Sequence, residues 1–174
     1  MKILAIQNRM GIGDMIIYLP FIEAIAKKFS TKVDILVKKS SKASEILKEN
    51  KFINEIINLD RNNRNREGVH DGIFGSFSLA NQLKIYKFQK VFIFNSSLRY
   101  KLICNLASIK DIYQYPLFEK KNQHIILAAQ DFIKNSIGEM VKSEPIITIN
   151  EKSKIDTISR FKITKKEKNI ILGI

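Results

Sequence analysis

The sequence is poor in the residues and runs that mark several large classes of protein. Its 174 residues hold one cysteine, Cys104, so no internal disulfide can form, and its apolar neighbours indicate a core position. The two histidines argue against a zinc cluster. No apolar run approaches the ~20 residues of a membrane span, and the N-terminus has no signal-peptide cleavage pattern. We therefore expect a cytoplasmic chain long enough for one domain with a full core.

Positive charge is in excess, and it is concentrated in the middle of the chain. The net charge is +13; residues 61–122 hold eleven basic and four acidic residues, whereas residues 1–60 hold ten and seven. A lysine-rich surface without a specific role is one explanation. The other is an anionic partner, such as a phosphorylated glycolipid or a membrane surface. Nucleic acid is not expected, because no helix-turn-helix, zinc-finger or RNP-type aromatic motif is present.

Strand-like and helix-like segments alternate, which predicts an α/β fold with a Rossmann-like, doubly wound and mostly parallel sheet. The expected strands are 2–7, 32–37, 53–59, 90–94, 110–115, 145–149 and 168–173. The expected helices are 14–29, 41–50 (with Ser40 or Ser41 as N-cap), 78–88, 96–108, 123–137 (ended by Gly138) and 151–161. Residues 60–75 are polar, basic and glycine-containing, and are expected to form a long loop.

The stretch NRMGIGDMIIYLP (8–20) joins the first expected strand to the first helix and is the most informative part of the sequence. Proteins of the α/β class bind phosphates and place active sites at such junctions. It is not a dinucleotide fingerprint, since Ile16 stands where the third glycine is needed. A tight turn with positive φ accounts for Gly11 and Gly13, and helix capping or the helix dipole accounts for Asp14.

The segment RMGIGDMIIYLPFIEAIAKKF (9–29) closely resembles the opening of glycosyltransferase family 9, the lipopolysaccharide heptosyltransferases. That family opens with a strand, a Gly-Ile/Leu-Gly-Asp turn, an apolar tetrad, a proline and a helix. Later parts of the family are similar, at lower identity, to segments 33–60, 79–109, 123–138 and 168–174.

The resemblance implies an inverting, metal-independent transferase with two Rossmann-like domains, the GT-B arrangement, and no cofactor. Its N-terminal domain would bind a phosphorylated, lipid-linked acceptor of the lipopolysaccharide-core type, and its C-terminal domain a nucleotide-sugar such as ADP-heptose. Residues 1–165 then match the acceptor-binding domain. Residues 166–174 would start a donor-binding domain that is missing from this chain, which alone is expected to be inactive. The enzyme would touch the inner face of the inner membrane peripherally.

Asp14 falls on the family's catalytic aspartate and is the expected general base, deprotonating an acceptor hydroxyl as it attacks the anomeric carbon. The acceptor-binding residues expected with it are Arg9, Gly11, Gly13, Asn95, Arg99 and Arg64, and no metal ligand is expected. Each arginine can pair with a phosphate or carboxylate, or be a solvated charge. His70 is a weaker acid–base candidate. The loop 60–75 and the turn 8–14 both follow strands, so we expect them at the same edge of the sheet.

Two other functions stay open on the sequence alone. The chain is either a non-enzymatic module that binds an acceptor or a membrane, or another Rossmann-type nucleotide-binding protein. A glycine turn without its third glycine is compatible with the second of these.

Overall fold

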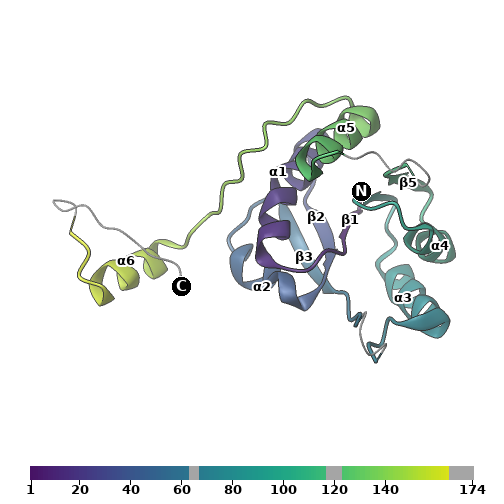
Figure 1. Cartoon of the computed structure of the whole chain (residues 1–174), viewed down its shortest axis with the longest axis horizontal. Helices are drawn as coiled ribbons and strands as arrows, with labels where there is room; N and C mark the ends of the chain where they lie inside the picture. Colours follow the sequence, from purple (N-terminus) through teal and green to yellow (C-terminus); the bar gives the residue numbers. More distant parts are fainter. Residues whose placement is uncertain (63–66, 117–122, 165–174) are drawn as a thin grey trace.

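The computed structural model describes residues 1–62, 67–116 and 123–164. Five parallel strands form one sheet in the order β3-β2-β1-β4-β5 (Figure 1). The strands are β1 (Ile3–Gln7), β2 (Val33–Val37), β3 (Ile53–Asn58), β4 (Lys90–Ile93) and β5 (Asp111–Gln114). The α/β fold with a Rossmann-like parallel sheet is thereby confirmed.

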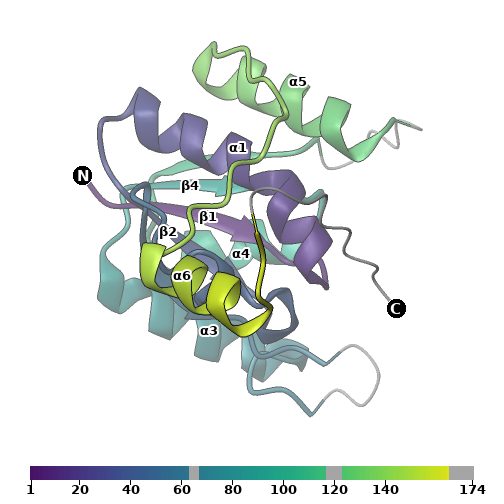
Figure 2. The ribbon, with the colours of Figure 1, turned by 90° about the vertical axis from the view of Figure 1, so that its left-hand side faces the viewer.

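Two layers of helix cover the two faces of the sheet (Figures 1 and 2). The helices are α1 (Ile12–Lys28), η1 (Lys39–Ser41), α2 (Ala43–Ile46), α3 (Gly72–Tyr86), α4 (Leu98–Leu106), α5 (Ile125–Ile137) and α6 (Glu151–Arg160). Ile3 and Ala5 of β1 pack into the core formed with α1 and α5, whereas Leu4 and Ile6 pack into the core formed with α3 and α4. Burial on both faces explains why this strand is an unbroken apolar run rather than an alternating one.

The first and fifth helices form one layer, and their sequences explain why. The buried residues of α1 are Met15, Tyr18, Leu19, Pro20, Phe21, Ile22, Ile25 and Ala26. Those of α5 are Ala129, Phe132, Ile133 and Ile137, which share one helical face. Gly138 ends α5 with φ 75°, the left-handed conformation that glycine adopts without strain, as expected.

Three local expectations are wrong, and a fourth is not tested. The expected helix 41–50 is only Ala43–Ile46, after a separate turn at Lys39–Ser41, and its N-cap is Lys42 rather than a serine. The helix expected from residue 78 begins at Gly72, so the loop is shorter than 60–75. Segment 145–149 is extended but unpaired, because no neighbouring strand lies beside it. The expected strand 168–173 lies outside the described residues.

Helix α6 stands away from the sheet and its helices (Figure 1). None of its residues is buried, and Asn150, its N-cap, donates a hydrogen bond of 3.3 Å from Nδ2 to Glu49 Oε1. Within the described ranges, no helix is long and apolar enough to cross a membrane.

Candidate active site at the carboxyl edge of the sheet

The carboxyl ends of the five parallel strands meet at one edge, and the candidate site lies there. Gln7 ends β1, Lys38 follows β2, Asn95 follows β4 and Tyr115 follows β5. Helices α1 and α4 also begin at this edge, so their free backbone amides and positive dipole ends face it. Ligands of open α/β sheets bind at this edge for these reasons.

The glycine turn brings the chain from β1 into α1 and leaves its surface open. Gly11 is the N-cap of α1, with φ 111° and ψ 157°, a region that is essentially restricted to glycine. Gly13 already lies in the helix and has no positive φ, so the turn explains Gly11 but not Gly13. A methyl group added to either glycine would meet nothing within 4 Å, so both border open space.

Asp14 is a first-turn acid of α1 and does not cap it, because no side chain bonds to the free amides of this helix start. It is half-buried, and no hydrogen bond or ion pair joins its carboxylate to another described residue. Its charge reaches Tyr18, one turn further along α1, and contributes to the raised pKa of that hydroxyl, although burial is the main cause. Asp14 is therefore an unengaged carboxylate at the ligand-binding edge.

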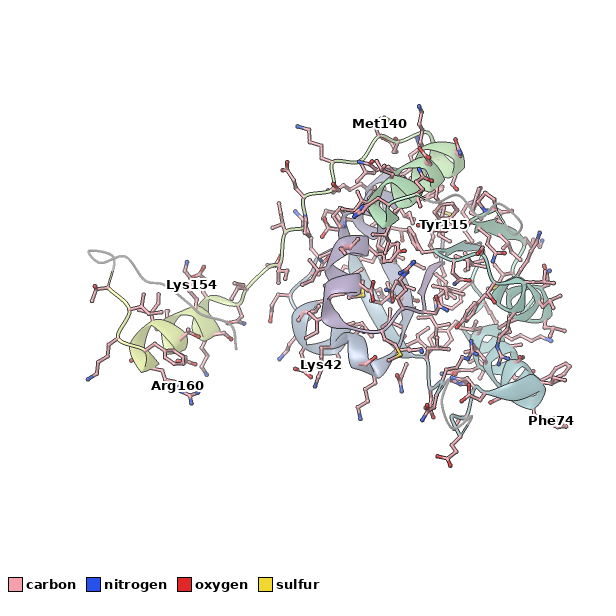
Figure 3. The ribbon with its side chains drawn as sticks, in the orientation of Figure 1. Lys42, Phe74, Tyr115, Met140, Lys154 and Arg160 are labelled. Carbon is pink, nitrogen blue, oxygen red and sulfur yellow. The ribbon has the colours of Figure 1, made fainter. Side chains whose placement is uncertain are left out.

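Two tyrosines lie near the glycine turn: Tyr18 is buried, and Tyr115 is half-buried. Tyr115 packs edge-on against Phe132 of α5, with ring centroids 4.9 Å apart, and its place under α5 is seen in Figure 3. Tyr18 packs on Phe94 at 5.2 Å. Burial raises the pKa of both hydroxyls, while Arg9 acts to lower them, so this exposed arginine lies within electrostatic reach of both. Both phenols are neutral donors at neutral pH.

Unsatisfied polar atoms gather at this edge. Across the described ranges, five buried amide and guanidinium atoms have no hydrogen-bond partner: Gln7 Nε2 and Oε1, Asn95 Nδ2, Arg99 Nε and Gln114 Oε1. Every one belongs to a residue at the carboxyl end of β1 or β5, just after β4, or in the first turn of α4, whereas the hydroxyls of Tyr18 and Tyr115 interact with each other. Each such atom costs roughly 1–3 kcal/mol if it stays unpaired. A polar ligand would satisfy them, so the cluster favours a polyhydroxylated ligand.

Asn95 and Gln114 are held in place by their own hydrogen bonds. Asn95 Oδ1 accepts from the Ser97 amide at 2.9 Å, and Gln114 Nε2 donates to the carbonyls of Asn95 and Ser97 at 3.0 and 2.9 Å. The remaining atoms of the two amides, Asn95 Nδ2 and Gln114 Oε1, are the unpartnered ones. Both side chains are thus oriented before any ligand binds.

Three cations, Lys38, Arg61 and Arg99, lie within electrostatic reach of one another at this edge. Lys38 is 7% exposed, and burial together with nearby Arg61 lowers its pKa. Burial and Arg61 also lower the pKa of Arg99. The carboxylate of Asp71 pairs with Arg61 Nε at 3.2 Å and also accepts from two loop amides. One engaged carboxylate beside three cations leaves this part of the site positive, which suits a phosphate or carboxylate.

The structure brings together most of the predicted site residues. Arg9, Gly11, Gly13 and Asp14 form the turn at the end of β1, and Asn95 and Arg99 follow β4 at the same edge. The described part of the loop after β3 also reaches this edge, through Arg61. Arg64 lies outside the described residues.

Sequence reasoning missed Gln7, Lys38, Gln114 and the two tyrosines. Gln7 and Lys38 each end an apolar strand with a polar residue, a signal that is visible in the sequence once the strands are aligned. Gln114 and Tyr115 carry no such signal. In the part of the chain that the structure describes, no group of three His, Cys, Asp or Glu side chains is placed to hold a metal ion.

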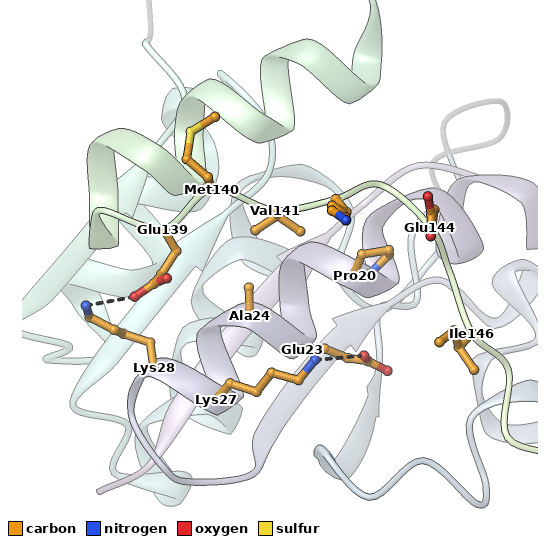
Figure 4. Close-up of a pocket in the computed structure, with 11 residues that line it drawn as sticks. Pro20, Glu23, Ala24, Lys27, Lys28, Glu139, Met140, Val141, Glu144 and Ile146 are labelled. Atoms are coloured by element: carbon orange, nitrogen blue, oxygen red, sulfur yellow. Dashed lines mark hydrogen bonds and ion pairs between the residues drawn. The ribbon is translucent and has the colours of Figure 1, made fainter.

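A separate groove of about 440 Å³ lies between α1 and the extended segment after α5 (Figure 4). Its walls include Pro20, and its rim carries the ion pair between Lys28 Nζ and Glu139 Oε1, 3.0 Å apart. None of the predicted site residues lines it. Two of its lysines are already paired with glutamates, Lys27 with Glu23 and Lys28 with Glu139.

The chain was compared with protein families, curated proteins and solved structures. No family model and no curated protein matches it. Among solved structures, a glycosyl transferase family 9 protein from Veillonella parvula matches with a TM-score of 0.65 and 17% identity, over 95% of this chain and 51% of that chain. ADP-heptose LPS heptosyltransferase II of E. coli matches with a TM-score of 0.61 and 16% identity, over 95% and 52%. The E. coli heptosyltransferase WaaC, with ADP-2-deoxy-2-fluoro heptose, matches with a TM-score of 0.56 and 14% identity, over 83% and 50%.

The fold is thus that of one Rossmann-like half of a two-domain, GT-B glycosyltransferase. More particularly, it is the fold of one half of the glycosyltransferase family 9 heptosyltransferases, and the resemblance of residues 9–29 to that family is confirmed at the level of the fold. The chain spans about half the length of the solved chains that it matches.

Proposed function

We propose that this chain is the acceptor-binding half of an inverting, metal-independent glycosyltransferase, with Asp14 as its general base. The observation that carries the proposal is the position of Asp14, a half-buried carboxylate without a partner at the ligand-binding edge. The solved structures support the sugar chemistry, since their names include ADP-heptose and a bound ADP-heptose analogue. The transferred sugar would be heptose or a related sugar, and the acceptor a phosphorylated, lipid-linked oligosaccharide of the lipopolysaccharide-core type.

In this mechanism Asp14 removes the proton from one acceptor hydroxyl. The acceptor oxygen forms a bond to the anomeric carbon on the face opposite the leaving group. The bond from that carbon to the diphosphate breaks, and the nucleoside diphosphate departs with the electron pair. A positioned base of this kind contributes roughly 10²–10⁴ in rate.

The remaining side chains of the site would bind and orient the acceptor. The amides of Gln7, Asn95 and Gln114 would bond sugar hydroxyls through the atoms that lack partners within the chain. Lys38 and Arg99 would bind an anionic group of the acceptor. Gly11 and Gly13 leave room for a sugar ring close to the backbone.

Binding and transfer are measured on this chain in one series. Calorimetry follows binding of a phosphorylated core oligosaccharide and of ADP-heptose separately, and release of ADP reports transfer when both are present. We expect the oligosaccharide to bind in the absence of donor. An oligosaccharide that does not bind, together with a nucleotide that does, identifies a different Rossmann-type nucleotide-binding protein. Acceptor binding that never leads to transfer, even with a donor-binding half supplied, identifies a binding module.

A further inference from the structure

A large apolar surface lies on the outer side of α3 and α4, away from the sheet. It consists of seven apolar side chains that are each at least 50% exposed: Val69, Ile73, Phe74, Phe77, Leu98, Leu102 and Leu106. We call this set the α3–α4 apolar surface. Phe74, 90% exposed, projects from the start of α3 in Figure 3. Exposed apolar side chains that gather on one side of a domain mark a docking site.

The spacing of these residues places them on one side of the molecule. Leu98, Leu102 and Leu106 follow one another every four residues, so they share the face of α4 opposite to its buried residues Tyr100 and Ile103. The exposed residues of α3 likewise lie opposite its buried residues, which are Gly75, Leu79, Ala80 and Leu83. The two helices pack side by side on the same face of the sheet (Figure 1).

The charge of this region identifies the partner. Residues 72–110, which span α3, β4 and α4, contain no acidic residue, and four of their lysines, Lys84, Lys87, Lys101 and Lys110, are exposed. Lys84, Lys87 and Lys110 line a groove of about 510 Å³ at the far ends of the two helices, and Lys101 is exposed on α4. A second copy of the chain would bring like charges together on this face. A bilayer with anionic headgroups attracts the lysines and accepts the apolar side chains.

We propose that the α3–α4 apolar surface docks the chain on a lipid bilayer that contains anionic lipids. Phe74, Phe77 and the three leucines enter the headgroup–acyl boundary, and Lys101 and the lysines at the far ends of α3 and α4 contact the headgroups. Helices α3 and α4 both begin at the carboxyl edge of the sheet, so docking holds that edge beside the membrane. The proposal does not depend on sugar transfer, and its failure leaves the proposed function untouched.

The first test is sedimentation of the full chain with phosphatidylcholine vesicles, with and without phosphatidylglycerol. We expect binding that requires phosphatidylglycerol and that falls as salt rises. The double variant Phe77→Ser/Leu102→Ser should bind at least about tenfold more weakly, because it removes two apolar anchors. Both positions are exposed, so its melting temperature should match that of the parent. The matched control is Ile155→Ser/Phe161→Ser, which removes exposed apolar residues in α6 and at its C-cap and should bind as the parent does.

The absence of tryptophan from the sequence provides a second test. A single Phe74→Trp variant gives fluorescence from this surface alone, and anionic vesicles should shift its emission to shorter wavelength. Phe161→Trp on α6 should show no shift. The proposal is overturned if the parent ignores anionic vesicles or binds neutral ones equally well. It is also overturned if the α6 variant loses binding instead, or if Phe77→Ser/Leu102→Ser dissolves a dimer and leaves vesicle binding unchanged.

Discussion

Arg99 is hydrogen bonded to the backbone of His70: its Nη2 donates to the carbonyl oxygen at 2.6 Å. The contact ties the first turn of α4 to the loop that precedes α3. The imidazole of His70 takes no part in this contact. His70 is only 6% exposed, and its Nδ1 accepts a hydrogen bond from the Asp60 amide at 3.1 Å. His70 therefore builds the loop of the site, and a general acid–base role does not fit its position.

The pH dependence of stability should report this buried imidazole. Burial lowers the pKa of His70, although Asp60 opposes the shift. The unfolded chain then binds a proton as the pH falls through about 6.5, whereas the folded chain does not. The free energy of unfolding should therefore decrease between pH 7 and the lower folded-state pKa, by at most about 1.4 kcal/mol per pH unit.

The variant His70→Asn should flatten that dependence, since an amide oxygen can accept the Asp60 hydrogen bond without titrating. Urea unfolding at a series of pH values measures it. His124→Asn is the control, because the other histidine of the sequence is exposed and caps α5. If His124→Asn removes the dependence and His70→Asn keeps it, the assignment to His70 is wrong.

Replacing each glycine of the turn by alanine should change the stability of the chain in opposite directions. Gly11→Ala should destabilise the chain by about 1–3 kcal/mol, because its φ of 111° and ψ of 157° suit only glycine. Gly13→Ala should stabilise it by about 0.5–1 kcal/mol, because this residue is helical and its Cβ would meet nothing. Thermal and urea unfolding of the two variants measure both effects. Equal destabilisation by both would show that the turn does not have this conformation.

The sheet could be read from the sequence, whereas several local elements could not. The three inner strands, β2, β1 and β4, are mostly apolar and buried on both faces, so their pattern alone identifies them. The edge strands β3 and β5 are partly exposed and mix polar with apolar residues. Segment 145–149 is equally β-branched, but a strand also needs a neighbour, and no local pattern reports that. The start of α3 contains glycines, and for that reason the sequence predicted a loop there. Gly75 is needed there because a Cβ would lie 2.3 Å from the backbone of His70, a contact between segments that only the fold reveals.

Residues of the candidate site could be predicted only where they stand in a recognisable motif or follow a strand. Asp14 and the glycines stand in one short stretch, and Arg99 and Asn95 follow a strand, which placed all of them at the same edge. Nothing in the sequence distinguishes Lys38 from the other lysines, and only the fold shows that it is buried near Arg61. Tyr18 and Tyr115 are 97 residues apart in the sequence, and only the tertiary packing brings them together.

Lys38 allows a test of the anionic part of the site. Lys38→Met removes a buried charge, so the melting temperature should be unchanged or higher. Affinity for a phosphorylated acceptor should fall about tenfold, which is the worth of one charge-assisted hydrogen bond. Calorimetry with the phosphorylated and the dephosphorylated oligosaccharide separates the two contributions. Lys39→Met, at the exposed neighbouring position, should change neither. Equal affinity of Lys38→Met and the parent for the phosphorylated form contradicts the assignment.

Asp14→Asn separates the catalytic explanation of this residue from the structural one. The asparagine keeps the size of the side chain and loses the proton acceptor and the favourable charge at the helix start. A first-turn carboxylate contributes about 0.3–1 kcal/mol to a helix, so the melting temperature should fall only slightly. If Asp14 is the base, the rate of sugar transfer by an enzyme that carries this domain should fall roughly 10²–10⁴-fold.

The control for this last change is Glu151→Gln, which alters a first-turn acid of α6 in the same way. It should lose a similar small amount of stability and keep full transfer. Initial rates and thermal melting of the three proteins decide between the explanations, because these differ by orders of magnitude in rate and hardly at all in stability. An Asp14→Asn protein that transfers sugar within a few-fold of the parent would show that Asp14 supports the helix and that the base is another residue.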